Sequence, residues 1–417
     1  MVAEIKPRGY LRATFHVPGS KSLTNRALLC AALAQGVSLI ENASDSEDSA
    51  LMANGLNQLG VLVRRDGTRW YVHGTGGNLY APKFPIPVGN AGTTLRFLLS
   101  LAALAHGTVV FHGDRRMAER PNEELLESLR QAGVRASQTP GEAQYKVVGG
   151  GLNGCRIIVP QDRSSQFLSS LLLVAPYARG DITIEVQGPA ISQSYVQMTL
   201  AVMELFGVTL DHGGGIYTVR APKRYLPTQY KIEADASSAS YGLASAAIAG
   251  GEVMVKGIQQ DSLQGDARFA EILLAMGCVI QNDKSGMRIS RAGDLLGISV
   301  DMNAMPDIVP TLAAVDLFAA GPSRIRNVAH LRFKESDRLE ALGSELRKLG
   351  ANIVIHSDGV EIFPAPLHGA LLDSHEDHRL AMSFALIGLR VAGVKIENPE
   401  CVRKSFPEFW KEFDRLS

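Results

Sequence analysis

Six runs of apolar residues recur along the chain at nearly constant spacing. Ala and Leu dominate each run, small polar residues precede it, and a Gly follows it. The six segments begin at residues 19, 89, 162, 235, 305 and 377, so successive starts are 70, 73, 73, 70 and 72 residues apart. Self-similarity at a fixed period is typical of a repeated structural unit. We therefore expect six copies of one supersecondary unit.

Within each copy, the pattern predicts a buried helix followed by a strand. The Ala/Leu runs are apolar on nearly every face, as expected for a helix surrounded by protein. Ser, Thr, Asn and Asp before the runs are typical N-cap residues, and the Gly after each run is expected as its C-cap. β-branched stretches such as 108–113 and 181–188 come next, and they predict strands.

A second helix and two further strands complete the predicted copy, which reads βαβαββ. Amphipathic helix patterns follow the first strand in five copies, as in 119–133 and 335–350. The sixth copy reaches the C-terminus with only 406–413 as its second helix. The N-terminal strands around 10–17 have no helix before them, so we expect them to supply what the sixth copy lacks.

This arrangement predicts an α/β fold of two similar domains, each made of three copies. Residues 19–234 would form a continuous domain, and residues 1–18 with 235–417 a discontinuous one. The chain would then cross between the domains twice, near Gly19 and Asp235. Two crossings suggest a hinge, and clefts between hinged domains commonly hold ligands.

Charge and composition narrow the possible functions. The 417 residues include 42 Lys+Arg and 42 Asp+Glu, and this balance argues against a nucleic-acid or membrane-surface partner. No apolar run reaches the roughly 18 residues of a membrane helix, and no signal-peptide core is found at the start. We therefore expect a cytoplasmic protein. The four cysteines form no C-x-x-C pair, so we expect no zinc site.

The starts of the predicted buried helices carry most of the candidate chemistry. A helix N-terminus offers unpaired N–H groups and the positive end of a dipole, so it favours anions. Three starts also carry cations, and the third copy offers neutral donors; these residues are Lys21, Arg26, Arg96, Arg379, Ser164, Ser165 and Gln166. Each one alone is better explained as a cap or a solvated charge, and only their recurrence at equivalent places favours a binding site. If the starts converge, they would bind a small molecule with several negative charges.

Further charged residues lie outside these starts. Arg120 is expected to open the second helix of copy two, and Lys404 lies near the C-terminus. Four charged residues fall within seven positions of copy five: Arg332, Lys334, Glu335 and Arg338. Such a run is usually a solvated helix start, but Lys334 is expected to follow a strand directly and to point into a cleft. A G-x-G-x-x-G pattern at 149–154 precedes a strand rather than a helix, so dinucleotide binding is rejected.

Five separated motifs resemble the 5-enolpyruvylshikimate-3-phosphate synthase family, and the resemblance covers essentially the whole chain. The motifs are GSKSLTNR, GNAGTTLR, SSQ, KESDRL and DHRLAM, starting at residues 19, 89, 164, 334 and 377. The resemblance implies the enolpyruvyl transferase fold, an inverse α/β barrel with three βαβαββ units in each domain. It implies transfer of the enolpyruvyl group of phosphoenolpyruvate to the 5-hydroxyl of shikimate 3-phosphate, with release of phosphate. This is a step of aromatic amino acid biosynthesis and a target of glyphosate. A monomer without metal or cofactor is expected.

The resemblance also implies roles for individual residues. Expected contacts to shikimate 3-phosphate are Lys21, Ser22, Arg26, Ser164, Ser165, Gln166, Ser192, Tyr195, Asp307, His330 and Lys334. Expected contacts to phosphoenolpyruvate are Lys21, Asn90, Gly92, Arg120, Gln166, Glu335, Arg338, Arg379 and Lys404. Asp307 matches the base for the 5-hydroxyl, and Lys334 and Glu335 match residues of proton transfer at the methylene. Nearby cations should keep Asp307 ionised. Which of the three performs each proton transfer stays open.

Two alternatives stay open from the sequence. A related transferase acting on UDP-N-acetylglucosamine typically carries a Cys in the loop before its phosphoenolpyruvate arginine, and the loop at 113–121 has none. A noncatalytic anion-binding repeat protein would need the cationic helix starts but not Asp307 and Glu335. The chain also departs from many family members at His330, where Asn is common, and at Phe97, where glyphosate-sensitive members carry Pro. Glyphosate sensitivity therefore stays open.

Overall fold

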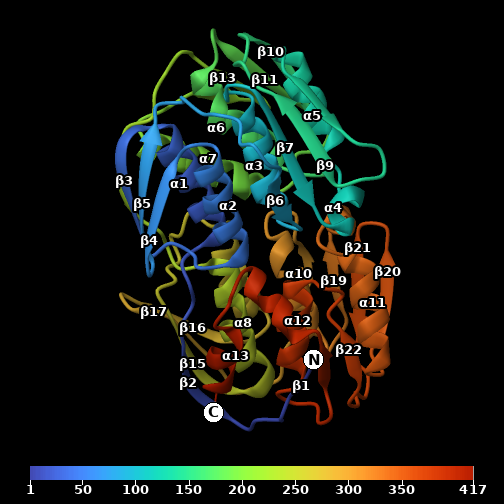
Figure 1. Ribbon diagram of the computed structural model, residues 1–417. Helices are drawn as coiled ribbons and strands as arrows, with labels where there is room; N and C mark the ends of the chain where they lie inside the picture. Colours follow the sequence, from blue (N-terminus) through green and yellow to red (C-terminus); the bar gives the residue numbers. More distant parts are fainter. Residues whose placement is uncertain (417) are drawn as a thin grey trace. The chain divides into compact units, whose positions relative to one another are not determined.

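The computed structural model describes residues 1–416, and the chain divides into two compact units (Figure 1). One unit is Gly19–Ile232, and the other combines Met1–Pro18 with Glu233–Ser417. The second boundary lies two residues before the expected start at Asp235. We call them the continuous unit and the discontinuous unit.

The continuous unit contains three sheets of four strands, one for each of the first three copies. In each sheet, the first strand is parallel to the second, and the hairpin that ends the copy adds the other two strands antiparallel. In sheet order, the strands are β14 (Gln229–Lys231), β3 (Gln35–Glu41), β5 (Arg69–Thr75) and β4 (Leu62–Asp66); β6 (Ile86–Gly89), β7 (Thr108–Gly113), β9 (Gln144–Val148) and β8 (Arg135–Gln138); and β10 (Cys155–Pro160), β11 (Ile182–Gln187), β13 (Ile216–Val219) and β12 (Asp211–Gly213).

The discontinuous unit repeats this plan with sheets of four, four and three strands. The three sheets are β16 (Val279–Asp283), β17 (Gly286–Arg291), β15 (Gly251–Lys256) and β2 (Leu11–Phe15); β18 (Ser299–Asp301), β19 (Ser323–Arg326), β21 (Gly359–Phe363) and β20 (Asn352–His356); and β1 (Val2–Glu4), β23 (Lys395–Glu397) and β22 (Leu371–Asp373). The predicted βαβαββ copy is thus present as separate mixed sheets.

Copies one and four have exchanged their first strands along the chain. The strand β2 precedes the first helix of copy one in sequence, but it pairs in parallel with β15 of copy four. The strand β14 precedes the first helix of copy four, but it pairs in parallel with β3 of copy one. The expectation that residues 10–17 complete the sixth copy was wrong. The strand β1 completes it, antiparallel to β23.

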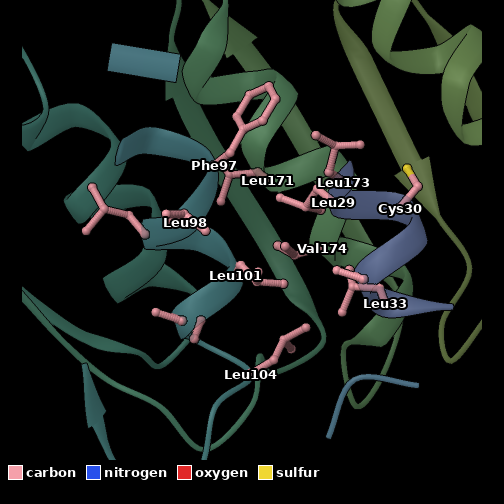
Figure 2. Packing of buried hydrophobic residues seen from close by; sticks show 14 of the residues in the cluster. Leu29, Cys30, Leu33, Phe97, Leu98, Leu101, Leu104, Leu171, Leu173 and Val174 are labelled. Atoms are coloured by element: carbon pink, nitrogen blue, oxygen red, sulfur yellow. The ribbon is translucent and has the colours of Figure 1, made fainter. Parts of the chain in front are cut away.

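The first helix of each copy lies in the core of its unit. These helices are α1 (Lys21–Leu33), α3 (Gly92–Ala102), α6 (Gln166–Val174), α8 (Ala236–Ala249), α10 (Val309–Asp316) and α12 (His378–Ile387), and nearly all their residues are buried. In the continuous unit, the side chains of α1, α3 and α6 gather around Leu29, Leu101 and Val174 (Figure 2). The prediction of helices apolar on all sides is confirmed. The expected C-cap Gly is found at α8, where Gly250 has a φ of 81°, but α1 ends at Ala34, before its Gly.

The second helices of the copies are only partly buried. They are α2 (Glu47–Gln58), α5 (Glu123–Gln131), α7 (Gln193–Leu205), α9 (Phe269–Ala275) and α11 (Arg338–Lys348), with α13 (Phe409–Asp414) in copy six. Copy two has one additional short helix, α4 (Arg115–Glu119). Short 3-10 helices precede several of the helices: η2 (Gly265–Arg268), η3 (Pro306–Ile308), η4 (Ala329–Phe333) and η5 (Pro399–Lys404).

Candidate functional site

Within each unit, several of the predicted site residues contact one another directly, and we call each such group a cluster. In the continuous unit, Arg96 connects the starts of α3 and α6. Its guanidinium donates hydrogen bonds to Gln166 Oε1 at 2.7 Å and to Ser164 Oγ at 3.3 Å. The Gln166 amide donates in turn to Thr93 Oγ1 at 2.9 Å. The two helix starts therefore lie side by side, and Ser165 is the N-cap residue of α6. This group is a set of hydrogen-bond donors that suits an anion.

Arg120 lies directly over Gly92 at the start of α3. The Arg120 guanidinium donates to the backbone oxygen and to the side-chain oxygen of Asn90, at 2.9 and 2.8 Å. A Cβ atom added to Gly92 would lie 2.6 Å from Arg120 Nη2, which is closer than nonbonded atoms approach. The absence of a side chain at Gly92 therefore leaves the space that the guanidinium occupies. Arg120 does not open a helix as expected: it is the C-cap of α4, and α5 begins at Glu123.

Lys21 begins α1 and forms an ion pair with Asp48 in the first turn of α2. The distance between Lys21 Nζ and Asp48 Oδ2 is 2.9 Å, and the Asp48 side chain is 4% exposed. The hydroxyl of Ser20 caps the helix by accepting from the Leu23 amide. Asp48 was not among the residues predicted for the site. Its only signal was an acidic residue in the first turn of a helix, which is a common position for a carboxylate.

Arg26 is buried and anchors α1 to α7. Its guanidinium donates to Thr199 Oγ1 at 2.8 Å, to the Ser22 carbonyl at 2.9 Å and to the Tyr195 carbonyl at 3.0 Å. Burial lowers the pKa of Arg26 to about 10, so the side chain stays cationic at neutral pH. Through these bonds Arg26 fixes Tyr195, whose turn begins at Ser192, the N-cap of α7 with a φ of 51°.

In the discontinuous unit, three cations surround the carboxylate of Asp307. Arg338 Nη1 lies 3.0 Å from Asp307 Oδ1, Arg379 Nη2 lies 3.2 Å from Asp307 Oδ2, and Lys334 Nζ lies 3.7 Å from Asp307 Oδ1. Burial alone would raise the pKa of Asp307, but Lys334, Arg379 and Arg338 outweigh it and hold the pKa well below its ordinary value. Asp307 is 19% exposed. The expectation that cations keep this residue ionised agrees with this geometry.

Arg338 is the most enclosed of these cations. It is buried, and its Nη2 lies 2.9 Å from Glu335 Oε2 while its Nε lies 2.7 Å from Asp377 Oδ2. Burial opposes its charge, but Asp377, Glu335 and Asp307 raise the pKa of Arg338 far above the ordinary value. Asp377 is the N-cap of α12, and its side chain also accepts from the Arg379 amide at 2.9 Å. Asp377 was expected only as part of the DHRLAM motif, and its contact with Arg338 was not predicted.

His330 and Lys334 lie on the segment around η4. His330 is 3% exposed, and its burial, together with the charge of Lys334, lowers its pKa to about 3. The imidazole is therefore neutral at physiological pH. Lys334 is the C-cap of η4, so the expectation that it directly follows a strand was wrong, since β19 ends at Arg326. Lys404 ends η5 and is half-buried.

The chain matches one known protein family over almost its whole length. The model of the EPSP synthase (3-phosphoshikimate 1-carboxyvinyltransferase) family matches residues 5–413. The chain belongs to the EPSP synthase family. It is 44% identical to the 3-phosphoshikimate 1-carboxyvinyltransferase of Syntrophobacter fumaroxidans over 99% of both chains. It is 42% identical to the enzyme of that name from Nostoc punctiforme, over 97% of this chain and 96% of the relative.

Two solved structures have the same fold as this chain. The EPSP synthase of Acinetobacter baumannii superimposes with a TM-score of 0.82 at 26% identity, covering 100% of this chain and 98% of that one. The enolpyruvyl transferase NikO of Streptomyces tendae superimposes with a TM-score of 0.81 at 18% identity, covering 100% of this chain and 97% of that one, and indicates the fold alone. The fold class expected from the EPSP synthase resemblance is confirmed.

The comparisons also bear on the alternative functions. The matching family model and both relatives described above carry the shikimate name, so the UDP-N-acetylglucosamine alternative gains no support. Among the described residues 1–416, no group of three or more His, Cys, Asp or Glu side chains is placed to hold a metal ion. Over the same residues, no helix is long and apolar enough to cross a membrane.

Proposed function

We propose that the chain transfers the enolpyruvyl group of phosphoenolpyruvate to the 5-hydroxyl of shikimate 3-phosphate, giving 5-enolpyruvylshikimate 3-phosphate and phosphate. The observation that carries this proposal is the arrangement around Asp307, where Lys334, Arg338 and Arg379 hold one ionised carboxylate. Family membership supports the same reaction. The two substrates bring two phosphates and two carboxylates, which cationic side chains bind with charge-assisted hydrogen bonds.

The geometry suggests how Asp307 becomes a base. A carboxylate whose pKa is far below the working pH is a poor proton acceptor. An anionic substrate that draws Lys334 and Arg379 away from Asp307 would raise the pKa of this carboxyl, because opposite charges no longer stabilise its ionised form. Substrate binding would thus prepare Asp307 to take the proton of the 5-hydroxyl as its oxygen attacks phosphoenolpyruvate.

The methylene carbon of phosphoenolpyruvate must gain a proton when the new C–O bond forms. It must lose a proton again when the bond to phosphate breaks and the double bond returns. Lys334 and Glu335 are proposed for these transfers. Glu335 is held by Arg338 at 2.9 Å, and Lys334 lies beside Asp307. Arg338 contacts both Glu335 and Asp307, and Lys334 Nζ lies 3.7 Å from Asp307, so both residues lie near the carboxylate that receives the hydroxyl proton.

The substrate contacts are assigned as the family resemblance implies, and each substrate takes residues from both units. For shikimate 3-phosphate we propose Lys21, Ser22, Arg26, Ser164, Ser165, Gln166, Ser192, Tyr195, Asp307, His330 and Lys334. For phosphoenolpyruvate we propose Lys21, Asn90, Gly92, Arg120, Gln166, Glu335, Arg338, Arg379 and Lys404. Arg26 would act partly through Tyr195 and Ser22, because its guanidinium is already bonded to their carbonyls.

The remaining properties are proposals of the same kind. We expect a cytoplasmic monomer that needs no metal or cofactor and binds no nucleic acid. We also propose that residues 19–234 and residues 1–18 with 235–417 act as two domains joined by a hinge. The two chain segments that lead out of the discontinuous unit lie side by side at its boundary, since the Asp235 amide donates to the Pro18 carbonyl at 2.8 Å. Within the continuous unit, the Asn42 amide donates to the Ile232 carbonyl at 2.9 Å.

The test is phosphate release from phosphoenolpyruvate with a panel of acceptors. We expect release with shikimate 3-phosphate and none with shikimate, UDP-N-acetylglucosamine or water. Phosphorus NMR of the product should show a phosphate monoester that is distinct from shikimate 3-phosphate. Release with UDP-N-acetylglucosamine instead would favour the alternative transferase, and an inert protein with every acceptor would favour the noncatalytic repeat protein.

A further inference from the structure

The start of copy four carries no proposed substrate contact. In the discontinuous unit, copies five and six supply Asp307 and Arg379, whereas copy four begins α8 at Ala236. A segment between α8 and α9 covers this helix start. The Gln264 side chain accepts from the Ala236 amide at 3.0 Å and donates to the Ala234 carbonyl at 2.7 Å. Asp266 in η2, which is 4% exposed, accepts a hydrogen bond from the Ser237 hydroxyl.

A layer of hydroxyl groups places this helix start beside Asp307 and Arg379. Ser240 Oγ lies 3.2 Å from Thr311 Oγ1, and Thr311 Oγ1 lies 3.3 Å from Ser383 Oγ. These contacts join α8, α10 and α12 at one level. Residues four positions apart lie above one another on an α-helix, so Ala236 and Arg379 lie one turn earlier on α8 and α12. Asp307 of η3 joins this layer, because its carboxylate lies 3.2 Å from Arg379 Nη2.

The continuous unit has the same two layers. Ser100 Oγ lies 3.0 Å from Ser170 Oγ, and one turn earlier Arg96 donates to Gln166 at 2.7 Å. In the layer one turn earlier, both positions, Arg96 and Gln166, carry long polar side chains. In copy four the corresponding residue is Ala, which cannot reach a ligand, and the carboxyl beside it comes from Asp266.

We propose that Asp266 is a positioning residue for phosphoenolpyruvate binding: it acts through its neighbours Asp307 and Arg379, and its protonation strengthens the affinity of the discontinuous unit for this anion. The inference rests on the proposed function of this unit. Three charged groups face Asp266, namely Asp307 of η3, Arg379 of α12 and Asp235 at the start of α8. Glu233 also contacts this segment, where it accepts a hydrogen bond from the Gln264 side-chain amide at 3.1 Å.

The electrostatics agree with this geometry. Burial, and after it the charge of Asp307, raises the pKa of Asp266 to about 7, although the Ser237 hydroxyl and Arg379 lower it. Below pH 7, Asp266 is mostly neutral, and its charge does not compete with an incoming anion for Arg379. Above pH 7, a second negative charge in this enclosed site competes for Arg379 and repels the phosphate. At the effective dielectric of a partly buried site, such a charge weakens anion binding by about fivefold or more.

The test compares the pH dependence of KM for phosphoenolpyruvate in wild type and Asp266→Asn, between pH 6 and 9. Phosphoenolpyruvate itself ionises in this range, so the ratio of the two KM values at each pH is the informative quantity. We expect the ratio of wild type to variant to rise about fivefold from pH 6 to 9, while kcat changes little. Asp316→Asn is the matched control, because Asp316 is another buried carboxyl of this unit, at the far end of α10 from Asp307.

Two further measurements keep the outcome decisive. Ser237→Ala removes a hydrogen bond to the ionised form, so it should move the midpoint of the wild-type profile to higher pH. Carbon-13 NMR of protein labelled at Asp carboxyl groups should show two resonances that titrate near pH 7 to 8, one of them absent from Asp266→Asn and the other absent from Asp316→Asn. A ratio that stays constant with pH, or a change equally large in Asp316→Asn, would overturn the proposal. Inactivity of the wild type at every pH would instead contradict the proposed function.

Discussion

Single residues hold the cations of both clusters in place. Arg120 needs the empty space above Gly92, and Lys21 needs Asp48 as its partner. Arg338 is held by Asp377, Glu335 and Asp307 together. A buried cation with fewer carboxylate partners would cost several kcal/mol in stability. The acidic partners are therefore as necessary to the site as the cations that we propose as substrate contacts.

Substitution of Gly92 by Ala should displace the Arg120 guanidinium. The added Cβ would lie 2.6 to 3.0 Å from three guanidinium atoms, so the side chain must move away from Asn90. Loss of a charge-assisted contact of about 1.5–3 kcal/mol would raise KM for phosphoenolpyruvate at least about tenfold. Steady-state kinetics measure this, with Gly9→Ala as the control, because nothing lies within 4 Å of a Cβ there. An unchanged KM would show that Arg120 does not depend on Gly92.

Asp316 predicts a pH dependence of stability that is separate from catalysis. Burial raises its pKa to about 8 from an ordinary value of 3.8. Above pH 4 the unfolded chain releases this proton while the folded chain keeps it, so stability falls as the pH rises and levels off above pH 8. Asp316→Asn removes this loss. Its unfolding free energy relative to wild type should increase by about 3 kcal/mol between pH 5 and 7. Denaturant titrations at both pH values that give the same difference would contradict the assignment.

At the scale of elements, the local sequence predicted the helices well. The six first helices could be predicted because their residues are apolar on every face, and such helices are buried wherever they pack. The pairing of strands could not be predicted in the same way, because a short strand such as β2 or β14 carries no mark of the sheet that it joins. The partners Asp48 and Asp377 were also hidden, since an acidic residue at a helix start is usually only a cap.

The strand exchange predicts that disruption of β14 loosens the sheet of copy one, whereas disruption of β2 loosens the sheet of copy four. Tyr230→Pro should remove ladder hydrogen bonds between β14 and β3, since Pro cannot donate. Amide exchange should then accelerate in 35–41 of the continuous unit and stay unchanged in 251–256. Ala13→Pro in β2 should do the reverse, since β2 pairs with β15. Hydrogen exchange with mass spectrometry of the full chain measures both variants, and each is the control for the other. Acceleration in the same segment for both would contradict the exchange.

At the scale of the whole molecule, equal numbers of Lys+Arg and Asp+Glu conceal local excesses of charge. The proposed contacts include cations from both units, and ligands with several negative charges would attract all of them. We therefore expect shikimate 3-phosphate with glyphosate or phosphate to compact the molecule. Small-angle scattering should show a smaller radius of gyration with these ligands, and Lys21→Met should reduce the effect. Identical scattering curves with and without ligands would contradict a hinge closure.

The most direct test of the central claim is the rate of 5-enolpyruvylshikimate 3-phosphate formation by wild type and Asp307→Ala. The account assigns Asp307 as the base for the 5-hydroxyl, and loss of such a group typically slows a reaction by about 10²–10⁴-fold. We predict a fall in kcat within that range, with the variant still folded. A folded Asp307→Ala variant that forms the product at the wild-type rate would contradict the account.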